Sequence, residues 1–425
     1  MTQASNTNLG PLAGLRVLEL ADEKGHYCGK LMADMGADVI KIEPPGGDAA
    51  RRVGPFAQDI PHPDRSLFFW YHNTNKRGIT LNLETPEGSD LFRRLARSAD
   101  ILLETLPPGY LPGLGLGYEA LSAHNPGLIM TSLTPFGQTG PYRDFVTSDL
   151  VSLALGGPMA SCGYDDVPGA PPIRGEGQQA YNTGSHYAVV GTLIALYWRD
   201  LTGQGQYIDA SIHEACACTT EGAFPSYVYH DKVVIRQTGR HAAMTPSLPW
   251  HFLCKDGKYL NLIGGVPRDD RQWRKLLDWM DSKGMAEDLT DAKYQDVFRQ
   301  RTLGASNPLS QHVGEVLHRF FASMPGDEGY HGAQACGMPM GLIRSPEESL
   351  DDPHFRVDRA FYAEWDDQEL GQKVVFPGRP YIFHKSPWQL RRMAPKLGEH
   401  NDEVYCGELG LSRERLTRLA EAGVI

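Results

Sequence analysis

Residues 15–43, LRVLELADEKGHYCGKLMADMGADVIKIE, decide the fold class of this chain. The apolar run 15–20 predicts a short buried strand, and residues 39–43 predict a second one. Between them, Gly25 and Gly29 precede a helical stretch at about 30–35. A strand, a helix and a strand, with the turn directly after the first strand, indicate a β-α-β unit.

The pattern continues beyond this unit. Further strands are expected at 79–83, 101–104, 128–133 and 207–212, and a helix at 86–98 with Thr85 as its N-cap. Strands that alternate with helices predict a parallel, doubly wound sheet, and therefore an α/β protein with a Rossmann-like large domain.

A loop rich in Gly, Pro and Ser spans about 134–180, and the segment 185–198, SHYAVVGTLIALYW, follows it. This segment is apolar on nearly all faces, which is typical of a buried helix. Asn182 or Thr183 would cap that helix.

The middle of the chain differs in character and predicts a smaller α+β domain inserted into the large one. A hairpin is expected at 251–263, turning at 255–257, followed by helices at 270–283 and 308–323. A last helix is expected at 412–422. We expect the N-terminal part of the large domain at 1–224, the small domain at 225–330 and a C-terminal part, 331–425, that returns to the large domain.

Composition and charge argue against several classes of protein function. The formal net charge of −11 disfavours a nucleic-acid-binding protein, which needs a basic face. Seven scattered cysteines form no CxxC pair, and the fifteen histidines lack metal-ligand spacing, so we expect reduced thiols and no metal site. The N-terminus is polar, and no run of 18 apolar residues occurs, so a cytoplasmic protein without a membrane span is expected.

Common catalytic motifs are absent from the sequence. GLGLG at 113–117 does not follow the first strand, so it does not fit a dinucleotide-binding loop. No GxSxG nucleophile elbow and no HExxH motif occur.

Several longer sequence segments resemble those of a known protein family in the same order, and together they cover most of the chain. They are PLAGLRVLELADEKGHYCGKLMADMGADVIKIE (11–43), GPF (54–56), NTNKRGITLNLETPEG (73–88), ADILLETLPPGYLPGLGLGYEAL (99–121), NPGLIMTSLTPFGQTGPY (125–142), TGQGQYIDASI (202–212), GMPMGLIRSPEESLDDPHFRVDR (337–359) and LGEHNDEVYCGELGLS (397–412). In this order they resemble the family III CoA-transferases, also called the CaiB/BaiF family.

The resemblance implies a fold and a reaction. Members have a large Rossmann-like domain, an inserted smaller domain, and two chains interlocked as a dimer. An aspartate attacks an acyl-CoA thioester, which gives a mixed anhydride and the CoA thiolate, and an acceptor acid then takes over the CoA. A carboxylate suits this role because it is ionised at neutral pH. The resemblance implies no bound cofactor, with the CoA thioester as substrate.

The family aspartate is missing from this chain. In the family it precedes the long apolar helix in a pattern like G-D-x-x-T-G. Here QQAYNTGSH at 178–186 aligns Ala180 with the aspartate, and a methyl group cannot attack an acyl carbon. We therefore expect no catalytic residue at this position, and a homologous partner subunit that supplies the aspartate.

Other residues could serve the site. Asp149 and Glu176 are fallback carboxylates, although Asp149 could simply cap a helix that begins at Leu150. Gln178 and Gln179 could donate hydrogen bonds to a carboxylate or oxyanion.

Further candidates follow from the resemblance. Lys41, Lys76 and Arg77 are expected to pair with the phosphates of CoA. Gly264 and Gly265 resemble the mobile glycine loop that shields the intermediate.

Three hypotheses for the function follow from the sequence. The first is the aspartate-lacking subunit of a heteromeric CoA-transferase, which moves CoA from a donor such as succinyl-CoA to an organic acid, with aromatic acids among the candidates. The second is acyl-CoA epimerisation or racemisation with Asp149 as base. The third is a non-catalytic acyl-CoA-binding scaffold.

Overall fold

The computed structural model describes residues 10–220, 222–262, 267, 269–294 and 305–425. The chain forms two compact units. The first unit comprises Met1–Gly156, Gly175–Thr219 and Arg359–Ile425, and the second comprises Gly157–Arg174 and Thr220–Asp358. In the described part of the chain, no helix has the length and apolar character needed to cross a membrane.

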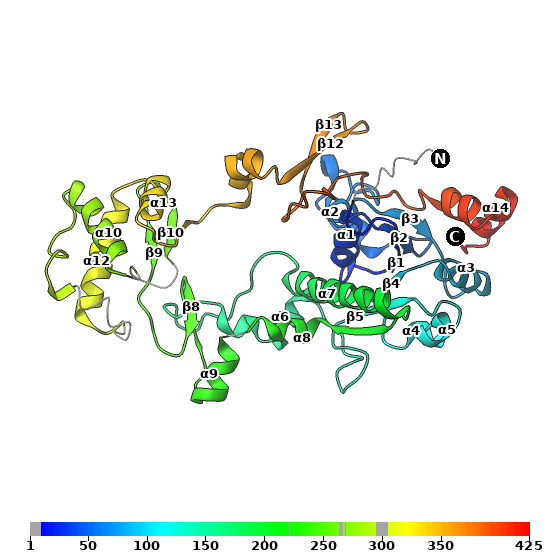
Figure 1. The fold of residues 1–425 in the computed structure, drawn as a ribbon, viewed down its shortest axis with the longest axis horizontal. Coiled ribbons are helices and arrows are strands. Elements are labelled where there is room, and N and C mark those ends of the chain that lie inside the picture. Colours follow the sequence, from blue (N-terminus) through cyan, green and yellow to red (C-terminus); the bar gives the residue numbers. More distant parts are fainter. Residues whose placement is uncertain (1–9, 221, 263–266, 268, 295–304) are drawn as a thin grey trace. The chain divides into compact units, whose positions relative to one another are not determined.

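A six-stranded parallel sheet forms the centre of the first unit (Figure 1). Its strands are β1 Arg16–Leu20, β2 Asp38–Glu43, β3 Arg77–Thr80, β4 Ile101–Glu104, β5 Ile129–Thr134 and β6 Tyr207–Ser211. They lie in the order β3-β2-β1-β4-β5-β6. The order reverses between β1 and β4, which is the topology of doubly wound nucleotide-binding folds. The predicted α/β class with a Rossmann-like parallel sheet is therefore confirmed.

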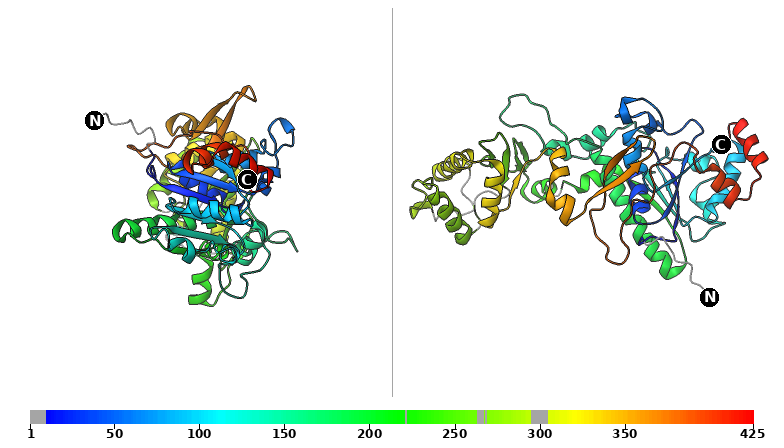
Figure 2. Two further views of the ribbon diagram at one scale, coloured as in Figure 1. Left: turned by 90° about the vertical axis from the view of Figure 1, so that its right-hand side faces the viewer. Right: turned by 90° about the horizontal axis from the view of Figure 1, so that it is seen from above.

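Helices cover both faces of this sheet. They are α1 His26–Asp34, α2 Leu67–Asn73, α3 Pro86–Ala96, α4 Tyr110–Gly113, α5 Tyr118–Ser122, α6 Asp149–Leu155, α7 Gln179–Thr202, α8 Ile212–Cys218 and α14 Arg413–Glu421. Leu18, Ile40 and Leu102 pack with α3, α5 and α14 in one core. On the other face, α1 and α7 pack against each other and against the strands. Figure 1 and Figure 2 show α14 beside other helices of the core that contains Leu18, Ile40 and Leu102.

One predicted strand is displaced. The strand expected at 79–83 is observed at Arg77–Thr80, because the chain leaves the ladder after Thr80. The amide of Leu81 still donates to Glu43, but that of Asn82 donates to the carbonyl of Val424 in the C-terminal segment. The helix at α3 begins as predicted, with the Thr85 hydroxyl accepting from the amide of Gly88.

The second unit is smaller and mixed. Its elements are α9 Ala223–His230, β7 Ile235–Gln237, β8 Arg240–Ala243, β9 His251–Leu253, β10 Tyr259–Leu262, α10 Asp270–Ser282, α12 Pro308–Ala322, α13 Gly326–Ala335 and β11 Met340–Leu342. The antiparallel pairing of β9 with β10 confirms the predicted hairpin, although its expected last residue, 263, lies outside the described residues.

The boundaries of this unit differ from the expected 225–330. The segment that follows 330 stays in the second unit because β11 pairs with β10, and Ala333 and Met338 enter its core. The earlier segment at 157–174 also belongs to it, since Asp165 and Thr238 exchange hydrogen bonds. The chain returns to the first unit at Arg359 and forms the hairpin β12 Tyr362–Asp367 with β13 Gln372–Pro377, which the sequence did not predict.

Glu104, at the end of β4, is a buried carboxyl group of this sheet. Burial raises its pKa from 4.5 to about 7, against the opposing effect of a 2.6 Å hydrogen bond from the Leu106 amide. The unfolded chain therefore ionises Glu104 first as the pH rises. This group should lower the free energy of unfolding by about 3 kcal/mol between pH 4.5 and 7.

Glu104→Gln should remove that pH dependence, because the amide oxygen still accepts from Leu106 and carries no charge. We expect the variant to gain stability over the parent as the pH rises from 4.5 to 7, measured by urea unfolding at several pH values. A difference between variant and parent that is constant with pH would contradict the assignment.

Candidate active site

The start of α7 holds the position where the family aspartate is expected. Ala180 lies in the first turn of α7 and is fully buried. The N-cap residue Gln178 makes no side-chain capping hydrogen bond. Instead, Asp149 Oδ1 accepts from the amides of Ala180 at 2.8 Å and Tyr181 at 3.2 Å. A carboxylate from α6 thus caps the helix on which the missing nucleophile would stand.

The predicted caps of this helix were wrong. The helix expected at 185–198 runs from Gln179 to Thr202, and Asn182 and Thr183 lie inside it. The amide of Asn182 donates to the Gln178 carbonyl, and the Thr183 hydroxyl donates to the Gln179 carbonyl. The earlier start escaped prediction because its cap comes from a distant residue.

Asp149 does not cap its own helix. Ser148 caps α6, since its hydroxyl accepts from the amide of Val151, and Asp149 is the first residue of that helix. The helix lies in the segment expected as a loop. Because two backbone amides of α7 donate to Oδ1, the Asp149 carboxylate has a structural role as the cap of α7.

The other predicted loop residues are spread around the same helix start. The side chain of Glu176 is exposed, and its carbonyl accepts from Gln179 Nε2 at 2.8 Å. Gln178 Nε2 donates to Glu23 Oε2 at 3.3 Å. Glu23 was missed by the sequence reasoning. Its place directly after the first strand, at the end where doubly wound sheets bind ligands, is the signal that could have found it.

Carboxylates dominate the electrostatics here. Burial raises the pKa of the Tyr181 phenol well above its usual range, and the charges of Glu23, Asp22 and Asp149 raise it further. Tyr181 therefore stays protonated as a neutral phenol at neutral pH.

Two of the predicted CoA-binding cations lie inside the fold. Lys41 Nζ is fully buried and contacts Asp48 Oδ2 at 3.1 Å and Glu19 Oε1 at 3.5 Å. Although burial lowers the pKa of Lys41, Asp48 and Glu19 outweigh it and raise the pKa. Lys76 Nζ contacts Glu19 Oε2 at 2.8 Å, and its burial lowers the pKa to about 8. The structure brings Lys41 and Lys76 together around one carboxylate.

Arg77 lies elsewhere, at the start of β3. Its guanidinium contacts Asp38 at 2.6 Å, Glu403 at 2.8 Å and Glu408 at 2.6 Å. Carboxylates of the same chain thus pair with all three predicted cations. That these residues also contact CoA phosphates stays a prediction.

A cavity of about 440 Å³ lies at the carboxyl ends of β1 to β4. Its lining includes Ala21, Asp22, Asn82, Thr105 and Tyr110. Among the described residues that line it, four are Asp or Glu and none is Lys or Arg. This is the switch-point edge where doubly wound folds bind ligands.

The remaining predicted loop residues, Gly264 and Gly265, lie outside the described residues.

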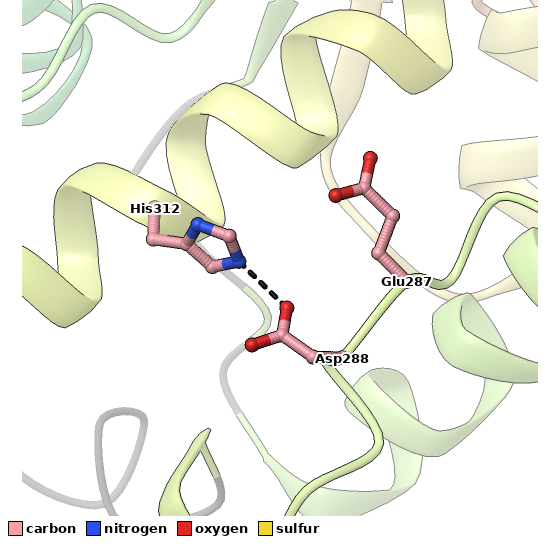
Figure 3. Close-up of side chains that lie close together, drawn as sticks. All are labelled: Glu287, Asp288 and His312. Carbon is pink, nitrogen blue, oxygen red and sulfur yellow. Dashed lines mark hydrogen bonds and ion pairs between the residues drawn. The ribbon is translucent and has the colours of Figure 1, made fainter.

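A separate group of possible metal ligands lies in the second unit, where the sequence predicted none. The ligand atoms of Glu287, Asp288 and His312 lie within 4.8 Å of one another, and His312 Nε2 contacts Asp288 Oδ1 at 2.6 Å (Figure 3). Arg319 pairs with Glu287 at 2.8 Å, and Lys293 pairs with Asp288 at 3.1 Å. Two cations of the same chain therefore pair with the carboxylates of this cluster.

The sheet order, with helices on both faces, defines a doubly wound α/β protein. A model of CoA-transferase family III matches residues 12–401. Subunit BbsE of the succinyl-CoA:(R)-benzylsuccinate CoA-transferase of Thauera aromatica is 36% identical over 95% of this chain and 96% of its own length. The beta subunit of the succinyl-CoA–L-malate CoA-transferase of Chloroflexus aurantiacus is 34% identical over 98% of each chain.

Solved structures agree with this assignment. The structure of a CaiB/BaiF family protein from Brucella suis has a TM-score of 0.76 and 27% identity, and the match covers 94% of this chain and 99% of that one. The chain belongs to CoA-transferase family III.

Asp149→Ala should weaken the start of α7, because it removes the acceptor for two first-turn amides. We expect a loss of about 1–2 kcal/mol in the free energy of unfolding, measured by urea denaturation. Asp144→Ala, which removes an exposed carboxylate paired with Arg143, is the matched control and should change stability by less than about 0.5 kcal/mol. Equal stability of the two variants would refute the capping role.

Proposed function

We propose that this chain is the aspartate-lacking subunit of a heteromeric family III CoA-transferase. A homologous partner chain supplies the aspartate that attacks the acyl-CoA. The donor is an acyl-CoA such as succinyl-CoA, and the acceptor is an organic acid, with aromatic acids such as the benzylsuccinate of the Thauera relative as the first candidates.

The observation that carries this proposal is the buried methyl group of Ala180 at the start of α7. The family reaction needs a carboxylate that attacks the thioester carbon, and a methyl group offers neither a nucleophile nor a proton. Asp149 is a poor replacement because two amides hold its Oδ1. The same contact disfavours the epimerase hypothesis, which needs Asp149 as a base.

The names of the relatives support a heteromer. The Thauera and Chloroflexus relatives are both named as subunits of CoA-transferases, and this chain covers nearly their whole length. We carry the subunit role from these relatives to this chain as part of the proposal.

An exposed apolar stripe on α7 supports a partner chain. Its residues are Tyr187, Val190, Ile194, Tyr197 and Leu201, each between 49% and 68% exposed. They recur at spacings of three and four, which is the pattern of helices that pack along a shared seam. The sequence predicted a helix buried on nearly all faces. In the single chain this face is open, and we propose that the partner of the interlocked dimer covers it.

The proposal includes a ligand position and a compartment. We propose that the cavity at the switch-point edge receives the nucleoside part of CoA, which carries no charge. The seven cysteines are free thiols, which fits a reducing cytoplasm.

The direct test is reconstitution. We expect the purified chain alone to transfer CoA from succinyl-CoA to a panel of acids at only a small fraction of the rate of its mixture with a family homologue that carries the aspartate. The amount of product thioester is measured by liquid chromatography. Full activity of the chain alone would refute the partner requirement, and an inactive mixture that still binds acyl-CoA would favour the scaffold hypothesis.

The stripe gives a separate prediction. Ile194→Glu places a charge at its centre and should weaken the heteromer by at least roughly ten-fold in Kd, measured by analytical ultracentrifugation. Ile60→Glu changes an exposed isoleucine outside the stripe and serves as the control. If both variants associate like the parent, the stripe is not the interface.

A further inference from the structure

A loop between β1 and α1 brings a second carboxylate to the start of α7. Residues 21–25 of this loop contact the first two turns of α7. The Ser185 hydroxyl donates to the Lys24 carbonyl at 3.4 Å, and Gln178 Nε2 donates to Glu23 Oε2 at 3.3 Å. The two contacts fix the loop against the same helix start where Ala180 replaces the family aspartate.

Glu23 differs from the other carboxylates nearby in its partners. Asp149 is held by backbone amides, and Asp22 accepts from the Thr105 hydroxyl at 2.8 Å and the Lys24 amide at 3.0 Å. Within the described part of the chain, Glu23 enters no ion pair, and it accepts a hydrogen bond from the neutral amide of Gln178. A carboxylate without a cationic partner keeps its charge available for an incoming electrophile.

In the part of the chain that the structure describes, the side-chain amide of Gln178 has a hydrogen-bond partner for its nitrogen, which donates to Glu23, but not for its oxygen. Gln178 Oε1 is buried, and among the described residues it has no hydrogen-bond partner. Buried polar atoms without partners are uncommon in folded proteins, and they mark places where a ligand or a rearrangement completes the hydrogen bonding. An amide donor of a ligand, such as the pantetheine arm of an acyl-CoA, would complete the hydrogen bonding of Gln178 Oε1.

Glu23 directly follows a segment that lines the cavity. Ala21 and Asp22 line the cavity at the switch-point edge, and Glu23 is the next residue. Glu23 also contacts Gln178, which lies two residues before Ala180. The loop that carries Glu23 thus joins a segment that lines the cavity to the helix start that carries the chemistry in the family.

We propose that Glu23 is the acyl-accepting nucleophile of this chain's own site. The proposal rests on the CoA-transferase function proposed above and adds a second, weaker site to the heteromer. A Glu23 carboxylate oxygen bonds to the thioester carbon, the carbon–sulfur bond breaks, and CoA leaves as its thiolate. The thiolate then attacks the Glu23 carbonyl of the mixed anhydride, which releases the donor acid and leaves a glutamyl-CoA thioester.

The second half of the reaction restores the enzyme. The carboxylate of the acceptor acid attacks the glutamyl thioester, forms a new anhydride and expels the thiolate. Attack of the thiolate on the acceptor's carbonyl gives the product thioester and regenerates the Glu23 carboxylate. Every step conserves electrons and needs only the acyl-CoA and the acid.

The experiment uses the heteromer in which the partner's aspartate is replaced by asparagine, so that activity of the partner's site is removed. The complex is mixed with succinyl-CoA and quenched with hydroxylamine, which attacks the activated glutamyl carbonyl of the thioester or the anhydride, expels CoA or the donor acid and leaves a glutamyl hydroxamate. Peptides are then examined by mass spectrometry. We expect the hydroxamate on Glu23 and a slow residual CoA transfer that falls by at least about 100-fold in Glu23→Gln. Glu119→Gln, at an exposed residue of α5, is the control.

The outcomes separate the two proposals. Residual transfer that Glu23→Gln leaves unchanged, or a hydroxamate on Asp149 or Glu176, would overturn the role of Glu23. Absence of both residual transfer and adduct would overturn it as well, while the complex with an intact partner would still show the proposed function. Thermal unfolding of Glu23→Gln alongside the parent shows whether a lost signal is a folding defect.

Discussion

The contact between the Asp149 carboxylate and the first-turn amides of α7 is the constraint on which the account depends. The amides of a helix start have no partners within the helix, and an anion there also meets the positive end of the helix dipole. Asp149 satisfies both needs from a different helix and fixes where α7 begins. At that start Ala180 is buried and Gln178 contacts Glu23.

A second constraint lies within the sheet. Glu19 stands on β1 with no exposure, and both Lys41 and Lys76 pair with it. Unpaired charges are costly to bury, so the three residues are interdependent and removal of one leaves the others uncompensated. Lys76 Nζ also donates to the carbonyl of His26 in α1 at 2.9 Å, so these cations link α1 to β1 and β2. The cavity at the edge of the same sheet is lined by carboxylates, so phosphate groups of a bound CoA would need cations from outside this lining.

The sequence predicted most of what depends on local pattern. The strand–helix alternation gave the parallel sheet, and Thr85 marked a helix start, because strand runs and capping residues act within a few positions. The true start of α7 could not be predicted, since its cap comes from Asp149, some 30 residues earlier. Ala180 was found by resemblance, whereas the burial of Lys41 and the contact of Glu23 with Gln178 arise only when distant segments meet.

The most direct test of the central claim is the burst of free succinate on mixing enzyme with succinyl-CoA in the absence of an acceptor acid. The burst counts the carboxylates that take up CoA as an enzyme thioester and release the donor acid, and the succinate is measured by chromatography. The account predicts a fast burst of about one succinate per heteromer that requires the partner's aspartate, and at most a slow phase from this chain. A fast burst of the same size from this chain alone would contradict it.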